Sequence, residues 1–220
     1  MKLAAALATS LAVGTPVSAQ EARFDWFALD SDSGEWRDDF DGETMAPSWT
    51  PHHETELANS RLGDGSLQIG SHREPLWGDG RPGFLGRPAV DGPYDVSAHL
   101  DYSRLEDGDV AGLVLRSDAD HWLSVQVERI EPADLIAVRL RDGADSPWAG
   151  KLVATTALPG SFEQQVSLRI VSADGGYALH YAGPTGDWIA LASGIDAAAL
   201  GNGSSIGLFA TDGAERTIDR

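Results

Sequence analysis

One predicted strand repeats side chains with sugar-binding chemistry at every second position. The stretch HWLSVQVER alternates polar or aromatic residues with aliphatic ones, so a strand would turn the two sets to opposite faces. The set opposite the aliphatic residues is Trp122, Ser124, Gln126 and Glu128. An indole can stack on the apolar face of a sugar ring, while amides and carboxylates take hydroxyl groups. This face therefore predicts binding of a neutral glycan.

Two further stretches would extend this face if their strands share its sheet. DLIAVRLRD places Arg139 and Arg141 opposite its aliphatic residues, and YDVSAHLDYS does the same with His99 and Asp101. Planar guanidinium and imidazole groups would then join the predicted ligand-binding set. The alternative is an ordinary solvated face, on which cross-strand Glu–Arg pairs are worth less than about 1 kcal/mol each.

The same face offers one route to catalysis. Glycoside hydrolysis needs two carboxyl groups, roughly 5 to 10 Å apart according to mechanism. Asp101 and Glu128 would be that pair if their strands were neighbours. The strand from Trp122 to Glu128 contributes only one acid, and the chain has no G-x-S-x-G, P-loop or H-E-x-x-H motif. Hydrolysis by Asp101 and Glu128 is therefore the alternative hypothesis.

Two tryptophans fall in predicted loops. Trp77 lies in PLWGDG and Trp148 in DSPWAG, both with Gly and Pro around the aromatic residue. A loop tryptophan is costly to leave in water, so it either covers the edge of the core or serves as a ligand platform. We include both as candidate stacking residues.

An acidic stretch near the N-terminus is a candidate metal site. DSDSGEWRDDFDGE contains Asp30, Asp32, Asp39 and Asp41, and clustered carboxylates can hold Ca²⁺. The spacing is not that of an EF-hand, because position five is Gly34 and position twelve is Asp41. A structural calcium ion is one interpretation, and a solvated acidic turn is the other.

The whole chain favours strands. Alternating patterns recur from Ala22 to the end, separated by turn signals such as LGDGS, ADGG and GNGS, and only IDAAAL could form a turn of helix. DVAGLVLRS is apolar on both faces, as expected of a central strand. Many short antiparallel strands with one apolar face predict an all-β sandwich or closed barrel.

Composition limits the environment and the partners. Residues 1–19 have the pattern of a secretory signal peptide, with Lys2, an apolar stretch and a small-residue cleavage site, which leaves 20–220 as one predicted domain in a secreted or periplasmic protein. The chain has no cysteine, 34 acidic and 16 basic residues and a net charge of −18. That charge argues against nucleic acid and anionic membranes as partners. It suits a neutral oligo- or polysaccharide.

Several segments, in order, resemble a known family. DDFDGETMAPSWT, LGDGSLQIG, AGLVLRSDADHWLSVQVER, GYALHYAGPTGDWIALASGID and SIGLFATD resemble the C-terminal domain of glycoside hydrolase family 43 β-xylosidases, roughly from Asp38 to Asp212. The resemblance implies a two-sheet antiparallel jelly-roll sandwich of the concanavalin A-like type. In those enzymes the catalytic acids belong to a separate propeller domain, so the resemblance implies an accessory role here.

The chain departs from that pattern at its ends. In such domains the strand after GLFATD commonly reads A-x-FDWF, whereas here FDWF occupies Phe24 to Phe27. A circular permutant would use Ala22 to Leu29 as the usual last strand; alternatively, this segment is the tail of a preceding sandwich. Both interpretations predict that Phe24 and Trp26 pack beside Ser205 to Thr211.

Together these observations favour a secreted, non-catalytic carbohydrate-binding or accessory module. Its predicted ligand-binding residues are Trp77, Trp122, Trp148, Gln126, Glu128, Arg139 and His99. A polysaccharide-active hydrolase or lyase and a structural or interaction domain remain the alternatives. We expect a monomer or a weak dimer, since an unpaired edge strand invites association.

Overall fold

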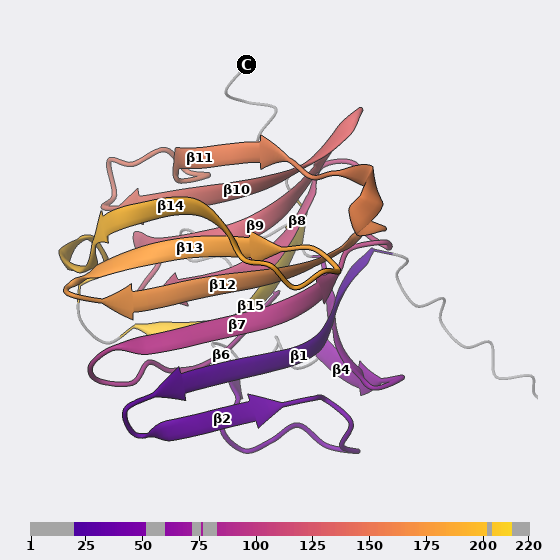
Figure 1. The fold of residues 1–220 in the computed structure, drawn as a ribbon, viewed down its shortest axis with the longest axis horizontal. Coiled ribbons are helices and arrows are strands. Elements are labelled where there is room, and N and C mark those ends of the chain that lie inside the picture. Colours follow the sequence, from indigo (N-terminus) through magenta and orange to yellow (C-terminus); the bar gives the residue numbers. More distant parts are fainter. Residues whose placement is uncertain (1–19, 52–59, 72–75, 77–82, 202–203, 213–220) are drawn as a thin grey trace, which may run out of the picture.

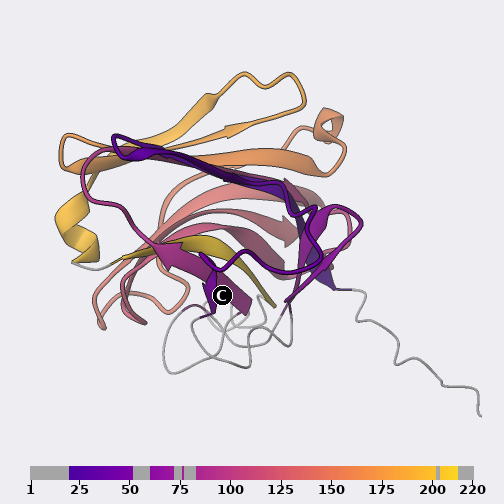
Figure 2. The same ribbon diagram turned by 90° about the horizontal axis from the view of Figure 1, so that it is seen from below.

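The computed structural model describes residues 20–51, 60–71, 76, 83–201 and 204–212. Trp77 and the predicted signal peptide lie outside these described residues. Within them the chain forms two antiparallel sheets stacked face to face, as Figures 1 and 2 show from two sides. The prediction of an all-β, concanavalin A-like sandwich is confirmed. No helix in the described ranges has the length and apolar character needed to span a membrane.

The first sheet has eight strands. In spatial order they are β14 (Ile189–Asp196), β13 (Gly176–Ala182), β12 (Gln165–Ala173), β7 (Tyr94–Asp101), β1 (Glu21–Ser31), β5 (Ser66–Gly70) and β4 (Ser60–Gly63), with β2 (Gly34–Asp38) paired to β1. Figure 1 shows most of this sheet facing the viewer. Short 3-10 turns, η2 (Gly160–Phe162) and η3 (Ala197–Leu200), occur where the chain crosses between this sheet and the other one.

The second sheet has seven strands. Their order is β11 (Lys151–Ala157), β10 (Ala133–Asp142), β9 (His121–Ile130), β8 (Asp109–Arg116), β15 (Ser205–Asp212), β6 (Gly83–Pro88) and β3 (Thr50–Pro51). Strand β8 is buried along its whole length between β9 and β15, as its two apolar faces predict. At Gly112 of β8 a Cβ atom would lie 2.3 Å from the carbonyl oxygen of Val125, so this close approach of strands requires glycine.

The N-terminal strand is an inner member of the eight-stranded sheet. Strand β1 pairs with β7 on one side and with β5 and β2 on the other, so it helps to complete this sandwich. The predicted packing of Phe24 and Trp26 beside Ser205 to Thr211 is wrong as a strand pairing, because β15 lies in the opposite sheet between β6 and β8. A permuted origin for β1 stays a prediction.

A bulge in β1 explains why Phe24 and Trp26, two residues apart, do not face the same side of the sheet. The pairing of β1 with β7 shifts by one residue between Phe24 and Trp26, which leaves Asp25 unpaired. Phe24 and Phe27 therefore both face the core with no exposed surface. A shift of one residue moves side chains to the other face. Trp26 accordingly lies on the outer face, where its ring stacks with His99 at 6.2 Å between centroids.

The core lies between the sheets, and a second apolar cluster lies behind one of them. The larger cluster takes its side chains from the inner faces of both sheets. The smaller cluster lies on the outer face of the seven-stranded sheet and consists of Leu76, Phe84, Val110, Val114, Trp122 and Phe209. The middle of that outer face is therefore occupied by this apolar cluster, and the polar residues of the face lie around it.

Candidate functional site

A chain of buried polar contacts runs along the outer face of β9. Ser124 Oγ donates to Gln126 Oε1 at 2.7 Å, and Gln126 Nε2 donates to Glu128 Oε1 at 2.7 Å. From β10, Arg139 Nε donates to Glu128 Oε1 at 2.6 Å and Nη2 donates to Oε2 at 3.3 Å. The i, i+2 spacing on β9 aligns these groups, and the facing strand supplies the cation. The sequence correctly predicted this alignment on one face.

This polar chain ends on a loop. Arg139 Nη1 donates to the carbonyl oxygen of Gly150 at 3.3 Å. Gly150 closes the connection between β10 and β11, which we call the clamp loop (residues 143–150). The ion pair between Arg139 and Glu128 exposes only 15% and 3% of the two side chains. Such a buried, hydrogen-bonded pair fixes geometry, because breaking it would leave an uncompensated buried charge.

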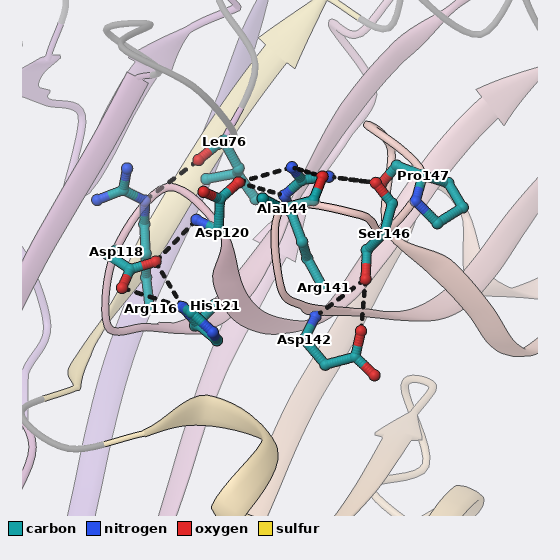
Figure 3. Close-up of polar contacts among 10 residues, drawn as sticks. All are labelled: Leu76, Arg116, Asp118, Asp120, His121, Arg141, Asp142, Ala144, Ser146 and Pro147. Atoms are coloured by element: carbon teal, nitrogen blue, oxygen red, sulfur yellow. Dashed lines mark hydrogen bonds and ion pairs between the residues drawn. The ribbon is translucent and has the colours of Figure 1, made fainter.

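A second arginine, Arg141, donates hydrogen bonds to the backbone of the clamp loop. Arg141 Nη1 donates to the carbonyl oxygens of Ser146 (2.7 Å) and Pro147 (2.9 Å), and Nη2 donates to that of Ala144 (3.3 Å). Its Nε and Nη2 also donate to Asp120 Oδ1 at 3.0 and 2.6 Å. Figure 3 shows this guanidinium between Asp120 and the loop carbonyls. Arg141 is buried, so three carbonyls and one carboxylate are fixed around one cation.

The ends of the clamp loop are anchored as well. Asp142 accepts hydrogen bonds from Lys151 Nζ at 2.7 Å and from the Ser146 hydroxyl, and these two bonds lower the pKa of Asp142 below its ordinary value. The Gly143 N–H donates to the Asp120 carbonyl at 2.9 Å, and the Gly150 N–H donates to that of Pro147 at 2.8 Å. The loop is thus tied at both ends and in its middle.

The turn before β9 supports this arrangement (Figure 3). His121 Nδ1 contacts both Asp118 carboxylate oxygens at 2.9 and 3.0 Å, and the Asp120 N–H donates to Asp118 Oδ1 at 2.8 Å. Burial opposes ionisation of Asp118, but the bonds from His121 and Asp120 outweigh it and lower its pKa. This turn presents Asp120 to Arg141. Sequence reasoning missed Asp118, Asp120 and His121, although the DADH turn between two strong strands was a visible signal.

The clamp loop presents Trp148 to solvent. Trp148 is 52% exposed although its neighbours Ser146, Pro147 and Gly150 are all hydrogen-bonded through their backbones. The predicted platform Trp122 is different, because it is only 3% exposed and belongs to the outer apolar cluster. A Cβ atom on Gly150 would lie 2.7 Å from Trp122 Cη2, so the loop packs directly against this ring. Trp122 is therefore a support of the clamp loop and is not placed as a surface platform.

The expected acid pair is not formed. His99 and Asp101 belong to β7 in the eight-stranded sheet, whereas Glu128 belongs to β9 in the seven-stranded sheet. Leu100 and Val127 face the core, so Asp101 and Glu128 point away from it on opposite sheets. Sheets stack about 10 Å apart, and two outward-pointing groups are farther apart still, beyond the spacing for glycoside hydrolysis. His99 is likewise separate from the Glu128 site and contacts Ser167 at 3.0 Å.

The predicted calcium ligands do not gather either. Asp39 accepts from Arg37 Nε at 2.8 Å, while Asp30 lies on β1 and Asp32 in the following turn. In the part of the chain that the structure describes, no three Asp, Glu or His side chains come close enough to hold a metal ion. This holds for Asp41 as well, so the prediction of a calcium site at this turn is wrong. Sequence proximity was misleading because a β1–β2 hairpin separates these carboxylates.

The sandwich has a concanavalin A-like fold, and the clamp loop connects two strands of its seven-stranded sheet. The family model of the β-xylosidase C-terminal concanavalin A-like domain matches residues 37–218, and the chain belongs to this family. Strand β1 precedes the matched region. No curated protein matches the chain.

Solved structures share the fold at low identity. A GH43_12 protein retrieved from a capybara gut metagenome is 16% identical with a TM-score of 0.72, over 80% of this chain and 34% of that one. A xylan β-1,4-xylosidase from Bacillus halodurans is 17% identical with a TM-score of 0.69, over 80% and 36%. A functionally unknown protein from Saccharomyces cerevisiae is 15% identical with a TM-score of 0.54, over 74% and 85%. The chain thus spans about a third of the first two and most of the third.

Proposed function

We propose that this protein is a secreted or periplasmic, non-catalytic carbohydrate-binding module that serves an accessory role in glycan processing. Its ligand is a neutral oligo- or polysaccharide, bound at the clamp loop. The observation that carries the proposal is a tryptophan, Trp148, with 52% of its surface exposed on a loop whose carbonyl groups are bonded by the partly buried Arg139 and the buried Arg141. Membership of a β-xylosidase accessory-domain family supports the glycan class.

Rigidity of the clamp loop favours binding. A ligand that stacks on Trp148 does not have to order this loop, since Arg139 and Arg141 already hold its carbonyl groups. Preorganisation of this kind lowers the entropic cost of association. An indole offers a large rigid apolar face with few rotatable bonds, which suits the flat face of a sugar ring. Asp142 and Lys151 at the base of the loop supply polar groups for hydroxyls.

The buried polar residues take a different role from the one that the sequence indicated. Gln126, Glu128 and Arg139 are bonded to each other and to the loop, so they act as positioning residues for Trp148. The separation of Asp101 from Glu128 supports a function without hydrolysis. The net charge of −18 favours neutral over anionic polysaccharides. The leader pattern of residues 1–19 supports export.

A glycan array tests the proposal with residues 20–220. The array includes xylo-oligosaccharides, because a structural relative is a xylan β-1,4-xylosidase. We expect binding by the wild type, a loss of at least about tenfold in affinity for Trp148→Ala, and no loss for Trp188→Ala. Trp188 is a matched control because it is also exposed but directly precedes β14, a strand of the eight-stranded sheet. Equal binding by wild type and Trp148→Ala would contradict the proposal.

A further inference from the structure

Strand β11 is a sheet edge that lacks most of the usual protection against pairing. Among the described strands it pairs only with β10, so no described strand pairs with the backbone groups on its other side. Six of its seven residues are exposed, including Leu152 (53%) and Val153 (43%). Figure 1 shows β11 on the outer side of the sandwich, together with the edge strand β14. An edge of this kind is a template for another strand.

The other described edges carry the devices that block pairing. Strand β4 has four residues with Arg61 among them, and β3 has two residues. Strand β2, which pairs only with β1, carries charges at Glu35, Arg37 and Asp38. Strand β14 is irregular, since its pairing with β13 shifts register twice and Gly194 adopts a φ of +72°. In β11, a bulge at Val153 and the charge of Lys151 protect only the first residues. Residues 154–157 are regular and uncharged.

Charge identifies the partner that fits this edge. The chain carries 34 acidic residues, yet none occurs between Asp145 and Glu163, the segment that contains β11. Two copies with a net charge of −18 repel each other over most surfaces, and an approach through an acid-free edge minimises that repulsion. Lys151 adds no repulsion at this edge because Asp142 pairs with it at 2.7 Å.

We propose that a second copy of this chain adds to β11, so that two seven-stranded sheets join into one continuous antiparallel sheet. Pairing residues 154–157 about a two-fold axis at Thr156 puts Thr156 of each copy opposite Thr156 of the other, Thr155 opposite Ala157, and Ala154 opposite Leu158. The two Lys151 residues then lie about 34 Å apart along the strands. Four residues of pairing give a weak dimer, which leaves the clamp loop outside the strand contact. This inference does not depend on glycan binding.

Sedimentation velocity tests the dimer with residues 20–220. We expect the wild type to change from monomer to dimer between about 5 and about 500 µM protein, as mass action requires. Raising NaCl from about 0.05 to about 0.5 M should strengthen the association, because salt screens the repulsion between two acidic copies. Amide hydrogen exchange at 154–157 should slow at the higher protein concentration.

Matched charge variants locate the contact. Thr156→Glu adds an acid to the exposed edge and should abolish dimerisation at every concentration. Ser33→Glu adds the same charge in the exposed β1–β2 turn and should leave the dimer unchanged within about twofold. A wild type that stays monomeric at the highest protein and salt concentrations would overturn the proposal. A dimer that Thr156→Glu and Ser33→Glu weaken equally would overturn it as well.

Discussion

The two outer faces of the sandwich each contain a carboxylate–guanidinium pair, but in different surroundings. On the seven-stranded sheet, Glu128 and Arg139 expose 3% and 15% of their side chains and bond onward to Gln126 and the clamp loop. On the eight-stranded sheet, Asp95 and Arg169 expose 32% and 27%, and Asp95 raises the pKa of Arg169 through its hydrogen bonds. The first pair is bonded through Arg139 to the clamp loop, whereas the second lies on a solvated face. Burial therefore separates a positioning network from an ordinary cross-strand pair.

Removing one partner of each pair should show the largest difference. Glu128→Ala leaves Arg139 buried without its carboxylate, so we expect a loss of about 3–5 kcal/mol in the free energy of unfolding. Asp95→Ala in the exposed pair should cost less than about 1 kcal/mol. Urea unfolding of both variants measures this. Similar losses for the two variants would erase the distinction between the faces. Glu128→Leu with Arg139→Met should recover most of the loss, because no charge is left buried.

Substitutions at two loop glycines, Gly150 and Gly186, distinguish the cost of a steric contact from the cost of backbone strain. Gly150 has a φ of +74° and its added Cβ would meet Trp122 at 2.7 Å, whereas Gly186 has a φ of +80° with open space around it. We expect Gly186→Ala to cost about 1–2 kcal/mol from the left-handed backbone alone. Gly150→Ala should cost about 1–3 kcal/mol more, because the loop must also move off the ring. Equal midpoints in urea would show that the clamp loop does not pack tightly.

Two aspartates should give pH dependences of opposite sign. The pKa of Asp142 is lowered by Lys151 and Ser146, so its contribution is present above the unfolded pKa of about 3.9 and is lost as pH falls through the folded value. Burial raises the pKa of Asp109, so the unfolded state loses its proton first and stability falls as pH rises from about 3.9. Asp142→Asn should therefore reduce the loss of stability as pH falls. Asp109→Asn should reduce the loss of stability as pH rises above about 3.9. Thermal unfolding from about pH 2.5 to about pH 7 tests both signs.

Trp148 should contribute least to stability. Its side chain is about half exposed, so Trp148→Ala should lower the free energy of unfolding by only about 1 kcal/mol. Trp122→Ala, within the outer apolar cluster, should cost about 3–5 kcal/mol. A large loss for Trp148→Ala would indicate that this residue is retained for packing.

Local patterns in the sequence predicted the architecture well and the site in part. The alternation in HWLSVQVER placed Gln126 and Glu128 on one face, and the apolar stretch around Gly112 identified a central strand, because both follow from the two-residue period. Alternation gives faces but not partners. It could not show that β7 and β9 belong to different sheets, and so Asp101 was joined to Glu128 in error.

Other features depend on contacts that no local pattern encodes. The burial of Trp122 requires Leu76 and Phe209, which come from distant segments, and the bulge at Asp25 reverses the face of Trp26 without any break in composition. The hold of Arg141 on three loop carbonyls depends on how the clamp loop folds back over its own strand. The sequence shows which residues are aromatic or charged. It does not show which distant residues bury them or bond to them.

The most direct test follows the Trp148 indole N–H by NMR during titration with xylohexaose. The account predicts that this resonance and the amides of residues 143–150 shift together and saturate, while those of His99 and Ser167 on the opposite sheet stay in place. The indole of Trp188 should also stay in place. Shifts confined to the outer face of the eight-stranded sheet would show that the clamp loop is not the binding site.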